Sequence, residues 1–277
     1  MNIHFNTMVK NEGILLDNVL PIWCHYPVDK FIFYDDNSND NTIEVIKKHL
    51  PLDRFIVIND NLPKFHEAHH RSRMLEHSRV SRADYVLSID ADEMLSANLK
   101  QDLLPLLKEY DRLDIWLYWF NVIENSLSRM RQDPLYAENY RSFILPLAKT
   151  GQFDLNLWKY HTPRTPGVHL PKARTKDYGI IHLQAINERH YALKQLWYKH
   201  YEFTEYGHTV QQINQGYDPV VNNLNFMAIN TPPSVVGNQS FDASIFDVIE
   251  DTKGYKKYIQ QNRNHELITF GKEYLEG

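Results

Sequence analysis

Cysteine is almost missing from the sequence, which has only Cys24 among its 277 residues. A single cysteine cannot form a disulfide within the chain and offers no partner thiol for a zinc cluster. Long apolar runs are missing too. Residues 1–6 have neither the basic start nor the apolar core of a signal peptide, and no later stretch approaches the length of a membrane span. We therefore expect a cytoplasmic protein in a reducing compartment, with no more than a peripheral contact to a membrane.

An excess of positive charge is also missing. The chain has 30 Lys and Arg residues against 35 Asp and Glu residues, a formal charge of −5. This balance gives no broad field that would attract a polyanion, so we expect no binding to nucleic acid. At 43% hydrophobic and 23% charged residues, the composition is that of an ordinary globular protein rather than a disordered one.

A short strand followed by acids is the most informative stretch. Residues 85–89 predict a buried strand, and Asp90, Asp92 and Glu93 follow it directly. Carboxylates at the C-terminal end of a strand point into the crevice where open α/β sheets bind ligands. The spacing of Asp90 and Asp92 lets both reach one hard cation. The alternative is a solvated acidic turn without a ligand, and the three acids alone do not separate the two interpretations.

Strands and helices alternate along the first part of the chain. Strands are predicted at residues 3–9, 30–34, 54–58 and 85–89, and helices at 14–25, 43–50, 65–80 and 97–110. This alternation with short connections predicts a mainly parallel sheet covered by helices on both faces. The polar segments after the first, second and fourth strands then share one edge, which favours a common site over three separate turns.

The rest of the chain is less regular. Residues 114–123 predict an aromatic strand, 124–180 short strands and loops around the crevice, 178–183 a strand and 188–206 a helix. The chain becomes rich in Asn and Pro from Gln215, and helical character resumes over residues 243–274.

Three segments at the strand ends carry a family resemblance. They are Met8-Val9-Lys10-Asn11-Glu12, Tyr34-Asp35-Asp36-Asn37-Ser38-Asn39-Asp40-Asn41-Thr42 and Leu87-Ser88-Ile89-Asp90-Ala91-Asp92-Glu93. In this order and spacing the chain resembles the family 2 glycosyltransferases with the nucleotide-binding GT-A fold, in particular short bacterial lipopolysaccharide-core and capsule transferases. The second segment is similar to the family signature Asp-Asp-Gly-Ser-x-Asp-x-Thr, with Asn37 in place of glycine. A weaker similarity extends over residues 140–183.

The resemblance implies an α/β fold with a GT-A-like domain at residues 1–205. Residues 1–124 would be its nucleotide-sugar-binding half and residues 125–205 its acceptor and metal half, with a helical C-terminal extension at 206–277. It further implies a nucleotide-sugar donor such as a UDP-sugar, Mn²⁺ or Mg²⁺ as cofactor, and a carbohydrate or glycolipid acceptor.

The resemblance also implies roles for individual residues. Asp36 would accept a hydrogen bond from the ring N–H of the base, Asp92 would bind the divalent cation, and Asp90 would face the ribose or the metal. His182 would be a further metal ligand. The remaining residues implied in donor binding are Thr7, Met8, Val9, Asn11, Glu12, Asp35, Arg71 and Arg73.

The catalytic base is the point at which the chain departs from the family. Related transferases carry Val-His-Glu where this chain has Tyr160-His161-Thr162, so their glutamate is missing here. An inverting transfer needs a base within hydrogen-bond reach of the acceptor hydroxyl. His161 and Glu188 are the first candidates for this base, and Asp154 and Asp177 are the second.

A competing motif lies at residues 66–70, where His-Glu-Ala-His-His matches the zinc-protease pattern His-Glu-x-x-His. Pro63 places this motif at the start of a helix, without the apolar turns that should precede it, so we do not favour a zinc protease. His66, His70, Arg73 and His77 share one helical face. This pattern predicts a solvated polar face or, alternatively, a face that borders the donor phosphates.

The resemblance implies that the chain transfers a glycosyl group. The transfer would be metal-dependent and inverting, and it would belong to surface-polysaccharide synthesis. A sugar nucleotidyltransferase is the alternative enzyme, but no Gly-rich, basic phosphate loop follows the first strand. A non-catalytic carbohydrate-binding protein would require the acidic cluster to be incidental.

Overall fold

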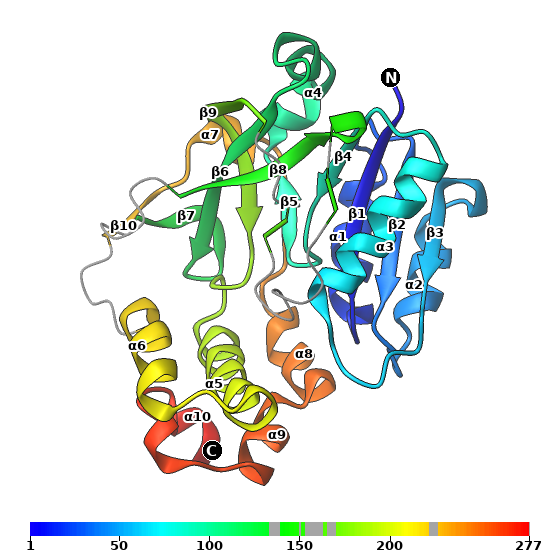
Figure 1. The fold of residues 1–277 in the computed structure, drawn as a ribbon. Helices are drawn as coiled ribbons and strands as arrows, with labels where there is room; N and C mark the ends of the chain where they lie inside the picture. The colour runs from blue at the N-terminus through cyan, green and yellow to red at the C-terminus, as the bar shows by residue number, and fades with distance from the viewer. Residues whose placement is uncertain (133–138, 150, 153–162, 165–169, 222–226, 277) are drawn as a thin grey trace. The chain divides into compact units, whose positions relative to one another are not determined.

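The computed structural model describes residues 1–132, 139–149, 151–152, 163–164, 170–221 and 227–276 (Figure 1). The chain divides into two compact units, each of which is described by itself. The first unit comprises Met1–Phe120, Glu138–Ile181 and Pro232–Gln239, and the second comprises Asn121–Ala137, His182–Thr231 and Ser240–Gly277.

A sheet forms the centre of the first unit. Its strands run in the order β3 (Phe55–Ile58), β2 (Lys30–Asp35), β1 (Ile3–Val9), β4 (Tyr85–Ser88), β8 (Tyr140–Pro146) and β6 (Asp114–Ile123). The first four are parallel to one another, whereas β8 is antiparallel to both β4 and β6. The short strand β5 (Glu93–Leu95) pairs with β9 (Lys172–His182), which also pairs with β6. The predicted mainly parallel α/β sheet is thus confirmed at β1 to β4.

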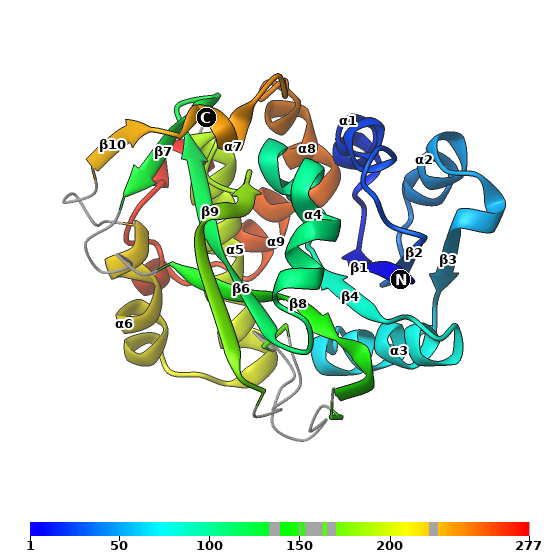
Figure 2. The same ribbon diagram turned by 90° about the horizontal axis from the view of Figure 1, so that it is seen from above.

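Helices cover both faces of the parallel strands. Figure 2 shows α1 (Gly13–Trp23) and α2 (Thr42–His49) on one face and α3 (Glu67–Val80) on the other. The unit also contains α4 (Ala97–Glu109), α7 (Pro233–Val236) and the short 3-10 helices η1 (Leu52–Arg54) and η3 (Leu147–Lys149). Strands covered on both faces are expected to be nearly continuous in apolar residues, as Lys30–Asp35 is after its first residue.

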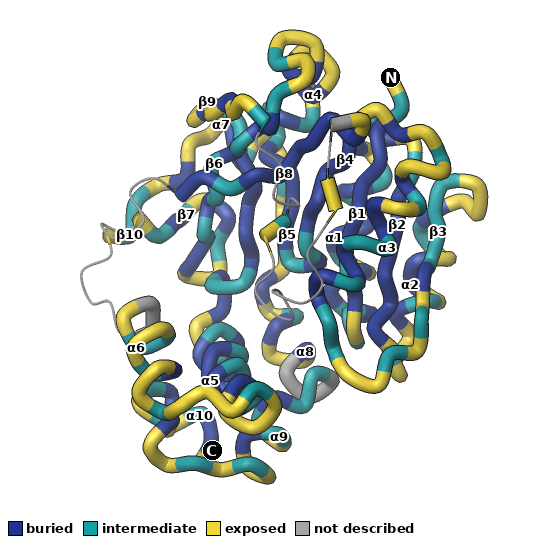
Figure 3. Tube along the Cα trace, in the orientation of Figure 1, coloured by how far each residue is buried: buried dark blue, intermediate teal, exposed yellow. Residues whose placement is uncertain are grey.

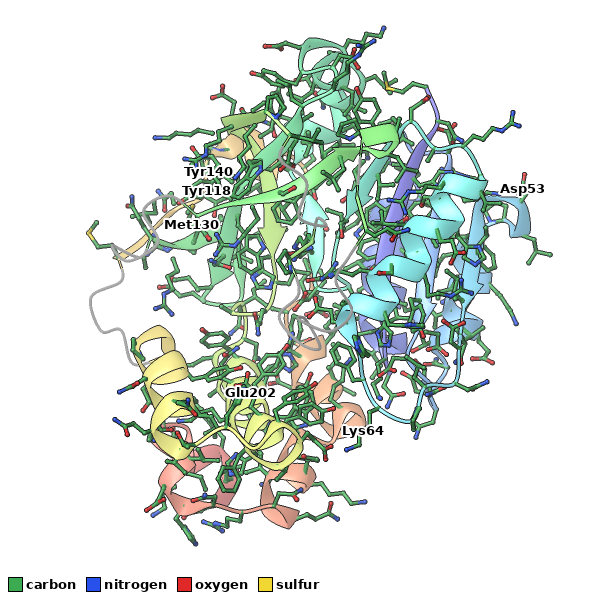
Figure 4. The ribbon with its side chains drawn as sticks, viewed as in Figure 1. Asp53, Lys64, Tyr118, Met130, Tyr140 and Glu202 are labelled. Atoms are coloured by element: carbon green, nitrogen blue, oxygen red, sulfur yellow. The ribbon has the colours of Figure 1, made fainter. Side chains whose placement is uncertain are left out.

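The core of this unit lies along β1, β2 and β4, whose traces are buried throughout most of their length (Figure 3). Phe5 on β1 contacts Trp23 of α1 at 4.7 Å and Phe31 of β2 at 5.2 Å between ring centroids. At the antiparallel side, Tyr118 and Tyr140 face each other in register, with an edge-to-face contact of 5.5 Å (Figure 4). The aromatic residues of these strands therefore belong to the packing of the unit.

Gly179 on β9 is required by a close approach to β6. A Cβ atom at this position would lie 2.5 Å from the carbonyl oxygen of Tyr118 and 2.1 Å from Cε2 of Phe120. Its backbone is also fixed by Ser96, whose N–H donates to the Gly179 carbonyl at 2.9 Å. Any side chain here would push the two strands apart.

The second unit is mainly helical. It contains β7 (Ser126–Gln132) paired with β10 (Met227–Asn230), and the helices α5 (Glu188–Tyr206), α6 (Val210–Val221), α8 (Ile245–Lys253), α9 (Tyr255–Gln261), η4 (His265–Leu267) and α10 (Lys272–Glu276). Leu193, Leu196 and Ile259 are at the centre of its core. Within the described residues, no helix combines the length and the apolar character needed to cross a bilayer.

Most predicted elements are present, and the differences lie outside the parallel strands. The Asn- and Pro-rich stretch from Gln215 contains the end of α6 and then β10, and β9 begins at Lys172 rather than at Tyr178. The predicted helical tail is divided into short helices, since Gly254 and Gly271 adopt positive φ between them. The predicted domain boundaries at 124 and 205 stay predictions.

Candidate active site

The loops after β1 and β2 are tied together by hydrogen bonds from backbone to side chain. The N–H groups of Asn11, Glu12 and Gly13 donate to Ser38 Oγ (2.9 Å), Thr42 Oγ1 (2.8 Å) and Asp40 Oδ2 (3.0 Å). These bonds hold the two strand ends in a fixed relation, because β1 and β2 are paired up to Val9 and Asp35.

Asn37 shows why the second loop tolerates a residue other than the family's glycine. Its φ is +57°, in the left-handed region that glycine adopts freely and that asparagine tolerates better than most residues. Its side chain donates to the carbonyl of Leu62 at 3.0 Å. The signature therefore keeps its backbone shape despite the substitution.

Asp36 is a buried carboxylate at the end of β2, 4% exposed. Burial raises the pKa of Asp36, and the ammonium group of Lys10, whose Nζ lies 2.8 Å from Oδ2, opposes that rise. On the other side, Nε2 of the buried His70 lies 3.6 Å from Oδ1. Neither ring nitrogen of His70 has a hydrogen-bond partner in the described structure. The contact of Asp36 with the base of a nucleotide stays a prediction.

Other residues predicted to bind the donor lie on β1 and at the end of β2. Thr7 is buried on β1 with Oγ1 lacking a hydrogen-bond partner in the described structure, and Met8 packs against the cluster around Ile32 and Met74. Asp35 accepts hydrogen bonds from the N–H of Ser38 at 3.2 Å and from Asn59 Nδ2 at 3.1 Å. Asp35 therefore holds its own loop against β3.

Arg71 connects α3 to the end of β4. Its guanidinium donates to Glu67 Oε1 at 2.7 and 2.9 Å, to Ser88 Oγ at 3.0 Å and to Asp90 Oδ1 at 3.3 Å. The side chain is only 5% exposed. Of the two predicted arginines, Arg71 is therefore the one at the strand ends.

Arg73 points elsewhere. Its Nε donates to Asp60 Oδ2 at 3.0 Å, and its Nη1 donates to Glu76. His69 Nε2 contacts the same oxygen of Asp60 at 2.8 Å. Donor binding by Arg73 stays a prediction.

A second arginine, which the sequence did not indicate, completes the cluster after β4. Nη2 of Arg164 donates to Asp90 Oδ2 and to Glu93 Oε1, both at 2.7 Å, and Nη1 donates to the Ser88 carbonyl at 2.9 Å. Burial would lower the pKa of Arg164, but the charges of Asp90 and Glu93 raise it above its ordinary value. Arg164 is therefore a fixed cation at the strand end.

Glu93 is the buried acid of this cluster and accepts hydrogen bonds from several of its neighbours. It is fully buried, and its Oε1 also accepts from Trp119 Nε1 at 2.7 Å while its Oε2 accepts from the N–H of Asp90 at 2.8 Å. The three acids after β4 therefore differ: Glu93 is interior, whereas Asp90 and Asp92 are half-buried.

The residues of the zinc-protease pattern are used in other ways. His66 precedes α3 as its N-cap and accepts from the N–H of His69 at 3.3 Å, and Glu67 pairs with Arg71. His70 is 0% exposed and stacks on Tyr34, so the predicted solvated face is wrong at this position because α3 packs onto β2 there.

Asp90 and Asp92 are the two oxygen ligands predicted for a metal ion, and this role stays a prediction. Among the residues that the structure describes, no three His, Cys, Asp or Glu side chains are grouped as metal ligands. Mg²⁺ commonly takes one or two carboxylates and completes its shell with phosphates and water, so these two acids fit a metal brought to the site with a diphosphate. Because both oxygens of Asp90 accept from arginines, Asp92 is the better candidate ligand.

Of the remaining candidates, His182 and Glu188 lie in the second unit, and Asp177 is exposed on β9 of the first unit. His182 Nδ1 contacts Asn121 Oδ1 at 2.7 Å, and Glu188 is exposed as the first residue of α5. His161 and Asp154 lie outside the described residues. The catalytic and metal roles of these residues stay predictions.

Carboxylates and arginines at adjacent C-terminal strand ends of an α/β sheet form the kind of site in which such folds bind nucleotides. The sequence agrees, because residues 13–164, more than half of the chain, match the glycosyl transferase family 2 profile. The chain belongs to this family.

The crystal structure of S. aureus TarS shares the fold, with a TM-score of 0.51 at 11% identity over 96% of this chain and 50% of that one. Two further solved structures match with lower scores. TarS 1-349 in complex with UDP gives 0.48 at 10% identity, over 95% and 89% of the two chains. GalNAc-T7 with UDP, GalNAc and Mn²⁺ gives 0.47 at 12% identity, over 79% and 54%. This chain thus spans half the length of the TarS chain, and no curated protein matches its sequence.

Proposed function

We propose that the chain is a glycosyltransferase that moves a sugar from a nucleotide-sugar donor to a carbohydrate or glycolipid acceptor. The observation that carries this proposal is the pairing of a buried base-reading candidate, Asp36, with the acids and arginines after β4 on one sheet edge. Family membership supports the reaction class. Because solved family-fold structures were obtained with UDP and UDP-GlcNAc, a UDP-sugar is the proposed donor.

In this proposal each residue contacts a different part of the donor. Asp36 accepts from the ring N–H of the base, and Arg71 orients Asp90 toward the ribose. Asp92 holds Mg²⁺ or Mn²⁺, which would offset the charge of the diphosphate leaving group when bound. Each of these groups lies at a strand end or on α3, and groups held in place in this way support the proposal.

For the transfer to the acceptor, we propose that the configuration at the anomeric carbon of the donor sugar is inverted. A base removes the proton of the acceptor hydroxyl while the oxygen attacks the carbon opposite the leaving diphosphate. Glu188 and His161 are the proposed bases, and His182 is a further proposed ligand. Retention of configuration in the product, seen by NMR, would overturn the one-step scheme.

We place the reaction in the cytoplasm, in the synthesis of a surface polysaccharide, following the resemblance to lipopolysaccharide-core and capsule transferases. An acceptor screen with lipid-linked and free oligosaccharides tests this assignment. Transfer to neither class would count against it.

The alternative enzyme, a sugar nucleotidyltransferase, is disfavoured by the loop after β1. Such an enzyme needs backbone N–H groups to cradle a triphosphate. Here the N–H groups of residues 11–13 already donate to side chains of the next loop.

Incubation with a panel of nucleotide-sugars and Mn²⁺ tests the proposal. Slow release of the free sugar and of the nucleoside diphosphate is the expected result. Release of pyrophosphate in a parallel incubation with a nucleoside triphosphate and a sugar 1-phosphate would support the nucleotidyltransferase. Absence of donor binding would leave the non-catalytic carbohydrate-binding protein.

A further inference from the structure

The charged network after β4 holds two arginines among four carboxylates. Arg71 binds Glu67 and Asp90, and Arg164 binds Asp90 and Glu93. Asp92 is close enough to act electrostatically on Arg164. With all groups ionised, these residues carry a net charge of −2, and without Arg164 they would carry −3.

Burial makes Arg164 a permanent part of this balance. Its side chain is 11% exposed, and its guanidinium lies over the ring of Phe143 at 4.7 Å from the centroid. Glu93 behind it is 0% exposed, whereas Asp90 on the open side is 34% exposed. A charge pair shielded in this way is screened weakly by salt, so its field acts on whatever binds at Asp90 and Asp92.

Arg164 also does more than join two segments of chain. A purely structural link would be satisfied by Glu93 and the Ser88 carbonyl, but the same Nη2 atom that binds Glu93 donates to Asp90 Oδ2 as well. Since Arg71 takes the other oxygen of Asp90, both oxygens accept from a guanidinium. The negative charge of Asp90 is therefore already offset by two cations of the protein, Arg71 and Arg164.

We propose that Arg164 is an internal cation of the donor site, which weakens the binding of a free divalent cation and strengthens the binding of the donor diphosphate. The physical reason is that a guanidinium repels a metal ion and attracts a phosphate at the same place. Metal and donor then bind best together. This inference rests on the proposed function. It describes how the donor site would favour the metal ion and the donor together over either one alone.

Two binding measurements on purified full-length protein test the inference. Binding of Mn²⁺ alone is followed by the electron paramagnetic resonance signal of the free ion, and binding of UDP without metal by calorimetry. Arg164→Met should bind Mn²⁺ roughly fivefold to tenfold more tightly and UDP more weakly by a similar factor. Damage to the fold would weaken both, so the opposite signs separate the proposed role from a structural one.

Removing Arg164 leaves the buried Glu93 without its paired cation, a change that is strongly destabilising. Glu93→Gln and the double variant Glu93→Gln/Arg164→Met therefore complete the series. Glu93→Gln lowers the negative charge and should bind Mn²⁺ more weakly than wild type, whereas the double variant keeps the wild-type net charge and should bind it about equally. Thermal melting confirms that each variant is folded. Arg263→Met, which removes a half-exposed arginine 4.0 Å from Glu276, should change neither affinity.

The outcomes are distinguishable. An Mn²⁺ affinity that fails to follow the net charge across the folded variants overturns the role of Arg164 and leaves the proposed function intact. A wild-type protein that binds neither Mn²⁺ nor UDP counts against the proposed function and, with it, against this inference.

Discussion

The imidazole of His70 lies flat against the phenol ring of Tyr34, with 4.0 Å between the centroids and 17° between the planes. Burial, together with electrostatic interactions with His69, His66, Lys10 and Arg71, lowers the pKa of His70 to about 3. The side chain is therefore neutral over the whole physiological range, and a neutral imidazole can stack against Tyr34 beside the carboxylate of Asp36.

This depressed pKa predicts a loss of stability in acid. The unfolded chain binds a proton at His70 below about pH 6.5, while the folded chain does not until about pH 3, so stability falls as the pH falls through that window. His70 should account for about 2 kcal/mol of lost stability between pH 7.5 and pH 5. Urea unfolding followed by circular dichroism measures it. His70→Phe should show a pH dependence smaller by that amount, and the exposed His265→Phe should match wild type.

Asp36→Asn should weaken donor binding without changing the dependence on metal. The substitution keeps the size of the side chain but replaces a charged acceptor, whose hydrogen bonds contribute about 1.5–3 kcal/mol, by a neutral amide. We expect the Kd for UDP to rise roughly tenfold to a hundredfold. An unchanged Kd in calorimetry would remove Asp36 from the base pocket.

Asp92→Asn should act on catalysis through the metal. Loss of one charged contact to a metal–diphosphate complex costs about 2–4 kcal/mol of transition-state stabilisation, or roughly thirtyfold to a thousandfold in rate. Donor hydrolysis measured against Mn²⁺ concentration tests this. Asp53→Asn is the control, since Asp53 is exposed on the 3-10 helix η1 (Figure 4). Near-normal, metal-dependent turnover in Asp92→Asn would contradict the assignment.

Gly179→Ala should destabilise the first unit. The added Cβ would meet the backbone of β6 at 2.5 Å, and overpacking of this kind costs about 1–3 kcal/mol. Gly216→Ala offers the matched comparison, because Gly216 lies in α6 with no atom within 4 Å of the added Cβ. Alanine there should raise stability by about 0.5–1 kcal/mol, as expected in a helix. The melting temperatures of the two variants should therefore move in opposite directions.

The parallel strands and the edge of the site could be predicted because their signals are local. Each strand is a short apolar run that stops at polar residues, and parallel pairing brings those ends together, as at Val9 and Asp35. Arg164 could not be found this way. It meets Asp90 across 74 positions of sequence, and nothing near it in the chain marks it as a partner of the acids. His70 was misjudged because a histidine on a polar helix face looks solvated until the helix is packed against Tyr34.

Two indole groups meet at Glu93. Trp119 Nε1 donates to its carboxylate at 2.7 Å, and Trp23 Nε1 donates to its carbonyl oxygen at 3.1 Å. Because indole emission responds to nearby charge and to its hydrogen-bond acceptor, the proposed donor site would contain its own optical reporter. Among the 5 tryptophans of the chain, these two should change intensity when a ligand reorders the carboxylates, so occupancy can be titrated without a label.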